Sequence, residues 1–228
     1  MKRIALTLLT LATLMLAHAQ DYRFEVGPVL GMSGYIGDLN NSNMFKHPGI
    51  TGGGIFRYNM NSRWAFRANL NYVSLSGNSV DIANKYPDPE HPGELINYKF
   101  NTHMIDVGAQ AEFNFLNYGI GARYKQYKRV SPYLTAGIGM AMCFHKGGGS
   151  HPTFVLPLGV GVKYKVKERL NLGFEFTMRK DFGDQVDNFT DLYGVKHSFA
   201  KNTDWHCLAM FSVTYEFSKR CVKCHYVE

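Results

Sequence analysis

Segments of roughly ten residues in which apolar and polar side chains alternate recur eight times along this chain, with turns between them. The last segment, residues 205–217, is the clearest, because its odd positions are almost all large and apolar. Its even positions include His206, Ser212, Thr214 and Glu216. Successive side chains of a β-strand point to opposite faces, so each segment has one apolar face and one polar face. Such strands can close into a barrel with an apolar outside.

The first residues have the layout of a secretion signal. Lys2 and Arg3 form a positive stretch, residues 4–16 are apolar, and residues 17–19 fit a small-x-small cleavage site. We therefore expect residues 1–19 to be a signal peptide that is removed. An uncleaved anchor helix is disfavoured by the short apolar stretch, and no other apolar run reaches the roughly 18 residues of a membrane-spanning helix. An exported chain with this alternation predicts an outer-membrane protein.

The alternation predicts eight strands, at about residues 23–35, 49–60, 64–76, 102–116, 130–144, 154–165, 170–179 and 205–217. The expected fold is all-β, an eight-stranded antiparallel transmembrane β-barrel over residues 20–217. Residues 218–228 follow it as a tail.

The connections between these strands alternate in length. Residues 61–62 and 166–169 are tight turns, and the longer connections are 36–48, 77–101, 145–153 and 180–204. Outer-membrane barrels have short periplasmic turns and long external loops. The alternation therefore predicts an outer-membrane location with both the N-terminus and the C-terminus in the periplasm.

The inward face of the predicted strands carries both signs of charge. The ionisable residues that we expect there are Arg57, Arg67, Asp106, Glu112, Lys163, Glu175, Arg179 and Glu216. An eight-stranded barrel is just wide enough for side chains to fill its interior. Buried charges must pair, because an isolated one is very costly. This set therefore predicts a packed ion network that fills the interior, in preference to a conduit.

The same residues argue against catalysis. Paired carboxylates such as Glu112 and Glu175 are typical of acid–base catalysis, but these two are needed to neutralise the inward arginines. Some small barrels modify lipids with residues near the outer rim, and four histidines lie near predicted external ends: His103, His145, His151 and His197. No nucleophile–base arrangement can be assigned to them. We expect no enzyme activity, no catalytic residue and no small-molecule substrate.

One predicted periplasmic connection, residues 117–129, is long where a short turn is expected. It is rich in basic and tyrosine residues, and its cations are Arg123, Lys125, Lys128 and Arg129. Two interpretations remain open: a basic-aromatic belt at the membrane surface, or a docking surface for a periplasmic partner. Nucleic acid is not expected as a partner. The formal net charge of +7, about +5 without the signal, is scattered through strands and a few loops of an exported chain.

The four cysteines fall into two groups. Cys143 and Cys207 lie in apolar strand patterns, where cysteine acts as a small hydrophobic residue. Cys221 and Cys224, with His225 after them, match the spacing of c-type haem attachment, but the tail offers no domain to enclose a haem. A local disulfide or a contact with a partner ranks first, metal second and haem last, since zinc needs further ligands. We expect no cofactor and no bound metal.

Several strings of the mature chain resemble one known family. They are residues 35–40 (YIGDLN), 56–59 (FRYN), 106–115 (DVGAQAEFNF), 156–165 (LPLGVGVKYK), 179–184 (RKDFGD), 201–205 (KNTDW) and 220–224 (RCVKC). In this order and spacing they resemble the PorG family of the type IX secretion system of Bacteroidota. The resemblance covers essentially the whole mature chain.

The resemblance implies an outer-membrane barrel associated with a periplasmic ring built from the lipoprotein PorK and from PorN. That system exports proteases and adhesins and in some relatives supports gliding motility. The family offers no catalytic residues to carry over. On this hypothesis the partners are outer-membrane lipid and the ring, and the docking residues are Arg123, Lys125, Lys128, Arg129, Cys221 and Cys224. The alternatives are a generic barrel for envelope stability or adhesion and, ranked last, a lipid-modifying enzyme.

Overall fold

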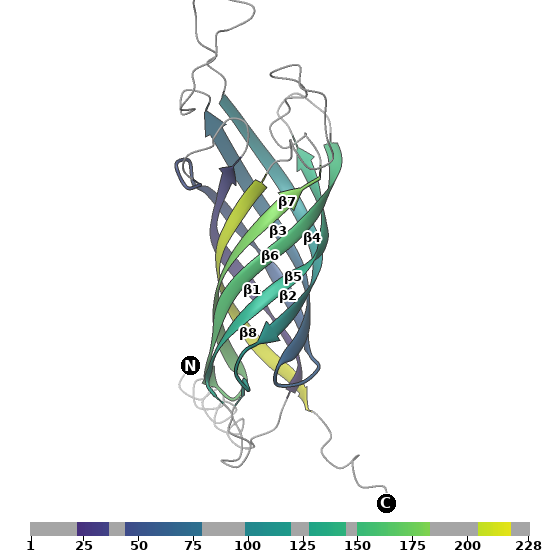
Figure 1. Cartoon of the computed structure of the whole chain (residues 1–228), viewed down its shortest axis with the longest axis vertical. Helices are drawn as coiled ribbons and strands as arrows, with labels where there is room; N and C mark the ends of the chain where they lie inside the picture. Colours follow the sequence, from purple (N-terminus) through teal and green to yellow (C-terminus); the bar gives the residue numbers. More distant parts are fainter. Residues whose placement is uncertain are drawn as a thin grey trace, which may run out of the picture.

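The computed structural model describes residues 22–36, 44–78, 99–119, 128–144, 150–182 and 205–219. They form eight strands: β1 (Tyr22–Ile36), β2 (Gly49–Asn59), β3 (Trp64–Asn78), β4 (Lys99–Asn114), β5 (Val130–Phe144), β6 (Ser150–Lys167), β7 (Leu170–Asp181) and β8 (Trp205–Lys219). Each strand pairs antiparallel with its neighbours in the chain, and β1 pairs with β8 (Figure 1). The sheet therefore closes into a barrel, which confirms the predicted fold class.

The strands run further than the alternation predicts. β6 begins at Ser150 and β4 at Lys99, and β8 continues to Lys219, so the start of the expected tail belongs to the barrel. Two strands end earlier than expected, β4 at Asn114 and β2, by one residue, at Asn59. Backbone pairing continues past the last lipid-facing side chains because it needs no apolar surface. Of the four predicted external loops, residues 37–43, 79–98, 145–149 and 183–204 lie outside the described residues.

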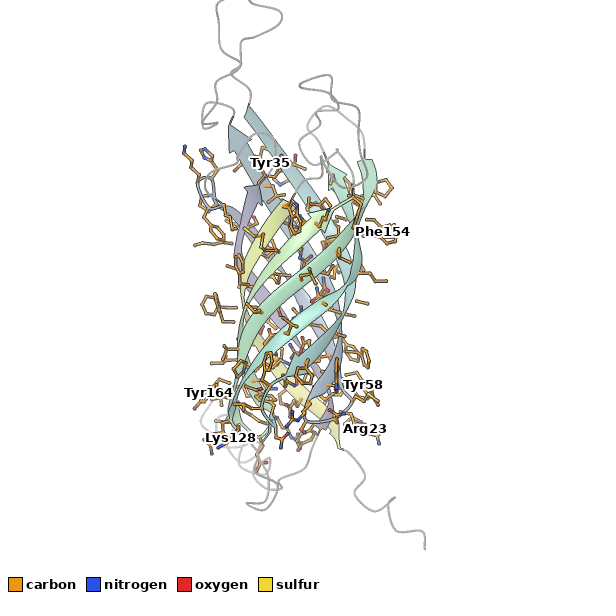
Figure 2. The ribbon with its side chains drawn as sticks, in the orientation of Figure 1. Arg23, Tyr35, Tyr58, Lys128, Phe154 and Tyr164 are labelled. Carbon is orange, nitrogen blue, oxygen red and sulfur yellow. The ribbon has the colours of Figure 1, made fainter. Side chains whose placement is uncertain are left out.

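The two ends of the barrel differ. β1 begins and β8 ends at one end, which we call the terminal end, and the opposite end is the distal end (Figure 1). The short connections β2–β3 and β6–β7 also lie at the terminal end. Figure 2 shows Tyr58, Tyr164, Arg23 and Lys128 at this end, and Tyr35 and Phe154 at the other.

The outer surface carries a broad apolar band. Leu70, Val107 and Val160 are 56%, 53% and 55% exposed near the middle of their strands. An apolar surface of this extent is costly in water but not in lipid. No helix within the described residues is long and apolar enough to cross a membrane. The band indicates that the barrel surface is suited to the interior of a bilayer.

Aromatic rings gather at both borders of this band. Towards the terminal end, the ring of Phe24 stacks on Phe56 and on Phe217, with ring centroids 5.6 and 5.7 Å apart. Towards the distal end, Tyr72 stacks on His103, and the Tyr72 hydroxyl lies 2.8 Å from His103 Nδ1. Two aromatic girdles around an apolar band are typical of outer-membrane barrels.

The interior has a polar half and a largely apolar half. The ion pairs that join Glu25, Arg57, Glu112 and Lys163 lie in the half of the interior towards the terminal end. The half towards the distal end holds one apolar cluster: Val29, Tyr35, Ile55, Val73, Leu75, Met104, Ala141, Cys143, Val155, Leu208 and Met210. This apolar half was not predicted, although strand parity places its residues inside, because the interior was expected to be polar and charged along its whole length.

A short segment in the last part of the β1–β2 connection folds back onto the outside of the barrel. The ring of Phe45 lies 6.5 Å from that of Phe176 on β7. The Met44 carbonyl approaches Gly34 so closely that a Cβ there would collide with it, and the Cys207 sulfur is the next neighbour. Cys207 faces outward in β8 but is fully buried. Its thiol donates to the Gly34 carbonyl at 3.6 Å. Cys207 thus acts as a small packing residue, as the sequence predicts.

A matched pair of substitutions tests whether the apolar band lies in a bilayer. Val160→Arg places a cation near the middle of the band, and Val130→Arg places one at its border, where Val130 opens β5. We expect Val160→Arg to lower the free energy of unfolding in phospholipid vesicles by about 2–4 kcal/mol and Val130→Arg by about 0–1 kcal/mol. Equal losses at the two positions, measured by urea titration, would contradict the assignment.

Candidate functional site

The centre of the interior network is the carboxylate of Glu112 on β4. Arg57 Nε on β2 lies 2.8 Å from its Oε2, and Arg67 Nη1 on β3 lies 3.1 Å from its Oε1. Lys163 Nζ on β6 makes a third, shorter ion pair with Oε2. All four side chains are at least 96% buried. One carboxylate therefore joins cations from three strands, two of which, β2 and β6, are not its sheet neighbours.

A second carboxylate, Glu175 on β7, also forms an ion pair with Arg67. Arg67 donates from Nη1 to Glu175 Oε2 at 2.5 Å and from Nη2 to Oε1 at 2.8 Å. This bidentate geometry is among the strongest for an arginine–carboxylate pair. The hydroxyls of Tyr133 and Thr177 also donate to Glu175, at 2.6 and 2.8 Å. Arg67 thus spans the lumen from β3 to β7 and fixes two carboxylates at once.

Two further carboxylates complete the network near the terminal end. Glu25 on β1 pairs with Arg57 and accepts hydrogen bonds from Asn59 at 2.8 Å and from Thr214 at 3.0 Å. Glu216 on β8 pairs with Lys165 at 2.5 Å. Each carboxylate in this half therefore has at least one cation beside it.

Two separate ion pairs lie in the apolar half. Arg179 pairs with Asp106, and His206 Nδ1 lies 2.6 Å from Asp181 Oδ2. Among the described residues, five buried Lys and Arg side chains face six buried carboxylates. The sixth carboxylate, Asp181, is the one that His206 contacts. The interior is thus close to neutral, as burial in a low-dielectric medium requires.

The structure places all eight residues of the predicted network inside the barrel, and each makes an ion pair there. The predicted network left out four members: Glu25, Lys165, Asp181 and His206. The alternation had placed His206 on the polar face of its strand but had not assigned it to the network. Glu25 and Lys165 have the inward parity of their strands, so the same alternation could have identified them. Asp181 lies beyond the predicted end of its strand, which hid its parity.

The described cavity within the network is small, and the carboxylates around it are already paired. The cavity between Arg67, Asn71, Glu175 and Arg179 measures about 10 Å³, room for roughly one water molecule. Each carboxylate is already in contact with a cation or with His206, so it is not placed to abstract a proton from a substrate. No group of three or more metal-ligating side chains occurs within the described ranges. The arrangement is suited to holding strands together.

Tyr118, in the described first part of the connection between β4 and β5, packs over the interior network at the terminal end. Tyr118 donates from its hydroxyl to Asn171 Oδ1 at 2.8 Å, and its ring lies over the ammonium groups of Lys163 and Lys165, at 5.9 and 5.4 Å. Burial, and after it the carboxylates of Glu25 and Glu216, raise the pKa of the Tyr118 phenol, so the hydroxyl keeps its proton and donates.

Two of the proposed docking residues of this connection, Lys128 and Arg129, lie within the described residues. Lys128 pairs through its backbone with Asn117 and Gly119, at 2.7 and 3.1 Å. The side chains of Lys128 and Arg129 are exposed at the rim. Arg123 and Lys125, like Cys221 and Cys224 in the tail, lie outside the described residues. The structure therefore joins the base of the connection to the interior network and places two of its cations at the surface.

Residues 2–226 match the family described as "Domain of unknown function (DUF6089)", and the chain belongs to this family. No curated protein sequence matches it.

Among solved structures, Neisserial surface protein A (NspA) is similar, with a TM-score of 0.50, 15% identity, and coverage of 85% of this chain and 97% of that one. The N-terminal β-barrel domain of Pseudomonas aeruginosa OprF has a TM-score of 0.46 at 14% identity, covering 86% of this chain and all of that domain. The outer membrane protein OprG of the same organism has a TM-score of 0.46 at 11% identity, covering 87% and 97%. The likeness to NspA shows the fold: the chain is a small barrel of the outer-membrane type.

The role of Glu112 can be tested by changing the charge balance around it. Glu112→Gln leaves Arg57, Arg67 and Lys163 with less negative charge than they need, so we expect the free energy of unfolding in vesicles to fall by about 3–5 kcal/mol. Adding Lys163→Met to Glu112→Gln removes one of the excess cations, and we expect it to recover part of the loss. A double variant that is less stable than Glu112→Gln alone would show that charge balance does not hold this site together.

Proposed function

We propose that this protein is a closed, non-enzymatic outer-membrane anchor of the type IX secretion system, which organises the periplasmic PorK/PorN ring. The observation that carries the proposal is the neutralised, packed interior centred on Glu112. Side chains fill an eight-stranded barrel of this kind, which makes it poorly suited to be a conduit, and the described cavity beside Arg67 and Glu175 holds roughly one water molecule. The function of the barrel then depends on its rims and on the lipid around it.

The charge of the terminal end supports a partner on that side. The exposed cations of this rim within the described residues are Arg23, Arg63, Lys128, Arg129 and Lys167. Glu168 is the only carboxylate of the described rim that is not fully buried. A rim whose exposed charges are mainly positive attracts an acidic protein surface and increases the rate at which that surface docks. In the proposed orientation, this rim faces the periplasm and the ring.

The attachment of the long β4–β5 connection supports the same assignment. Tyr118 and Gly119 hold its base in the mouth, and Arg63 Nε donates to Asn117 Oδ1 at 3.2 Å. A docking element on a rigid base loses less conformational freedom on binding than a free loop. The resemblance to the PorG family supplies the partner: a periplasmic ring of PorK and PorN.

Charge reversal at the rim tests this proposal. We expect Lys128→Glu with Arg129→Glu to reduce co-purification of PorK and PorN from native envelopes at least tenfold and to impair secretion. The matched control is Lys46→Glu with Lys180→Glu, which makes the same charge change at the distal end, where Lys46 lies between β1 and β2 and Lys180 lies near the end of β7. If the ring proteins co-purify equally with both variants, and if secretion is unchanged in a deletion strain, the chain is a generic envelope barrel and the proposal is wrong.

A further inference from the structure

The turn between β6 and β7 holds an arginine in a structured aromatic setting. Arg169 Nε donates to the Tyr22 hydroxyl at 2.8 Å, and Arg169 Nη1 donates to the Tyr215 hydroxyl at 3.0 Å. The guanidinium carbon also lies 4.8 Å from the centroid of the Tyr22 ring. These contacts connect a turn to the first strand and the last strand, so they fix the guanidinium in one place on the barrel wall.

The chemistry of these contacts leaves donors available. A guanidinium has five N–H groups, and the two phenols take up two of them. Each phenol accepts from Arg169, so its own O–H remains free to donate elsewhere. The two hydrogen bonds raise the pKa of Arg169, so the group keeps its positive charge. A fixed cation with several N–H and O–H donors is suited to an anion with several oxygens.

The position of the cluster specifies the kind of anion. Tyr215 faces outward from β8 and is 43% exposed, whereas Tyr22 is 6% exposed beneath the guanidinium. Leu172 and Val213, paired in register directly above, belong to the lipid-facing band. Tyr164 pairs with Leu172 and lies at the same border of the band (Figure 2). The donors therefore lie just beyond the apolar band, at the depth where phospholipid headgroups meet the barrel.

We propose that Arg169 and Tyr215 bind the phosphodiester of a membrane phospholipid at the terminal end, with Tyr22 positioning the guanidinium. Arginine suits phosphate because its planar N–H groups match two phosphate oxygens at once. Lys167, two residues before Arg169, adds an exposed cation, and Glu168 opposes it. The other rim cations within the described residues have no phenol hydroxyl bonded to them in this way. The site does not depend on the proposed role in secretion.

The test uses the full mature chain, purified in detergent and titrated with phosphatidylglycerol under native mass spectrometry. We expect Arg169→Gln to weaken binding of the tightest lipid about tenfold or more, the scale of one charge-assisted hydrogen bond. Tyr215→Phe, which removes only a hydroxyl, should weaken it a few-fold. The control Arg23→Gln removes the same charge from the same rim without touching a phenol. Heat-modifiable migration in gels shows that each variant is folded.

Three results would overturn the proposal. Unchanged affinity in folded Arg169→Gln would remove the site. An equal loss in Arg23→Gln would reduce the effect to the general charge of the rim. Inorganic phosphate that displaces phosphatidylglycerol from the wild-type chain at equal concentration would identify the ligand as free phosphate, not a lipid headgroup.

Discussion

The contact of one buried carboxylate, Glu112, with three cations is the interaction on which the interior of this barrel depends. Removing a single ion from water costs several kcal/mol in a protein interior, so these charges remain buried only because they neutralise one another. Since the partners come from β2, β3 and β6, neutralisation also requires that the lumen be narrow enough for side chains to meet across it. Charge balance in the interior therefore requires a lumen that the side chains close.

The remaining features follow from that closure. The apolar cluster fills the half of the lumen that lacks the main network, and the lipid-facing band and its aromatic borders occupy the outside. Tyr118 covers Lys163 and Lys165 at the mouth, so the base of the connection that carries Lys128 and Arg129 packs against the network. Because the interior is filled, the charged groups that a partner can reach lie at the rim.

Much of this was accessible from the sequence because strand parity assigns each side chain to a face. Parity placed Arg57 and Glu112 inside and Val160 outside without any knowledge of pairing. Parity could not show that Arg67 reaches Glu175, since β3 and β7 are not neighbours and their contact depends on how the barrel closes. Nor could it place Tyr118 or Met44, which follow no strand alternation and are located by packing against the completed barrel. The docking role of Arg123 and Cys221 stays a prediction.

The central claim, that the interior is filled and closed, is tested most directly by conductance in planar lipid bilayers. The purified chain, shown to be folded and inserted, is expected to give no discrete ion-conducting steps, because the network and the apolar cluster occupy the lumen and the cavity beside Arg67 and Glu175 has room for roughly one water molecule. Stable conductance steps that scale with salt concentration would contradict the account. They would show a continuous aqueous path through the barrel, and the charged residues would then line a pore.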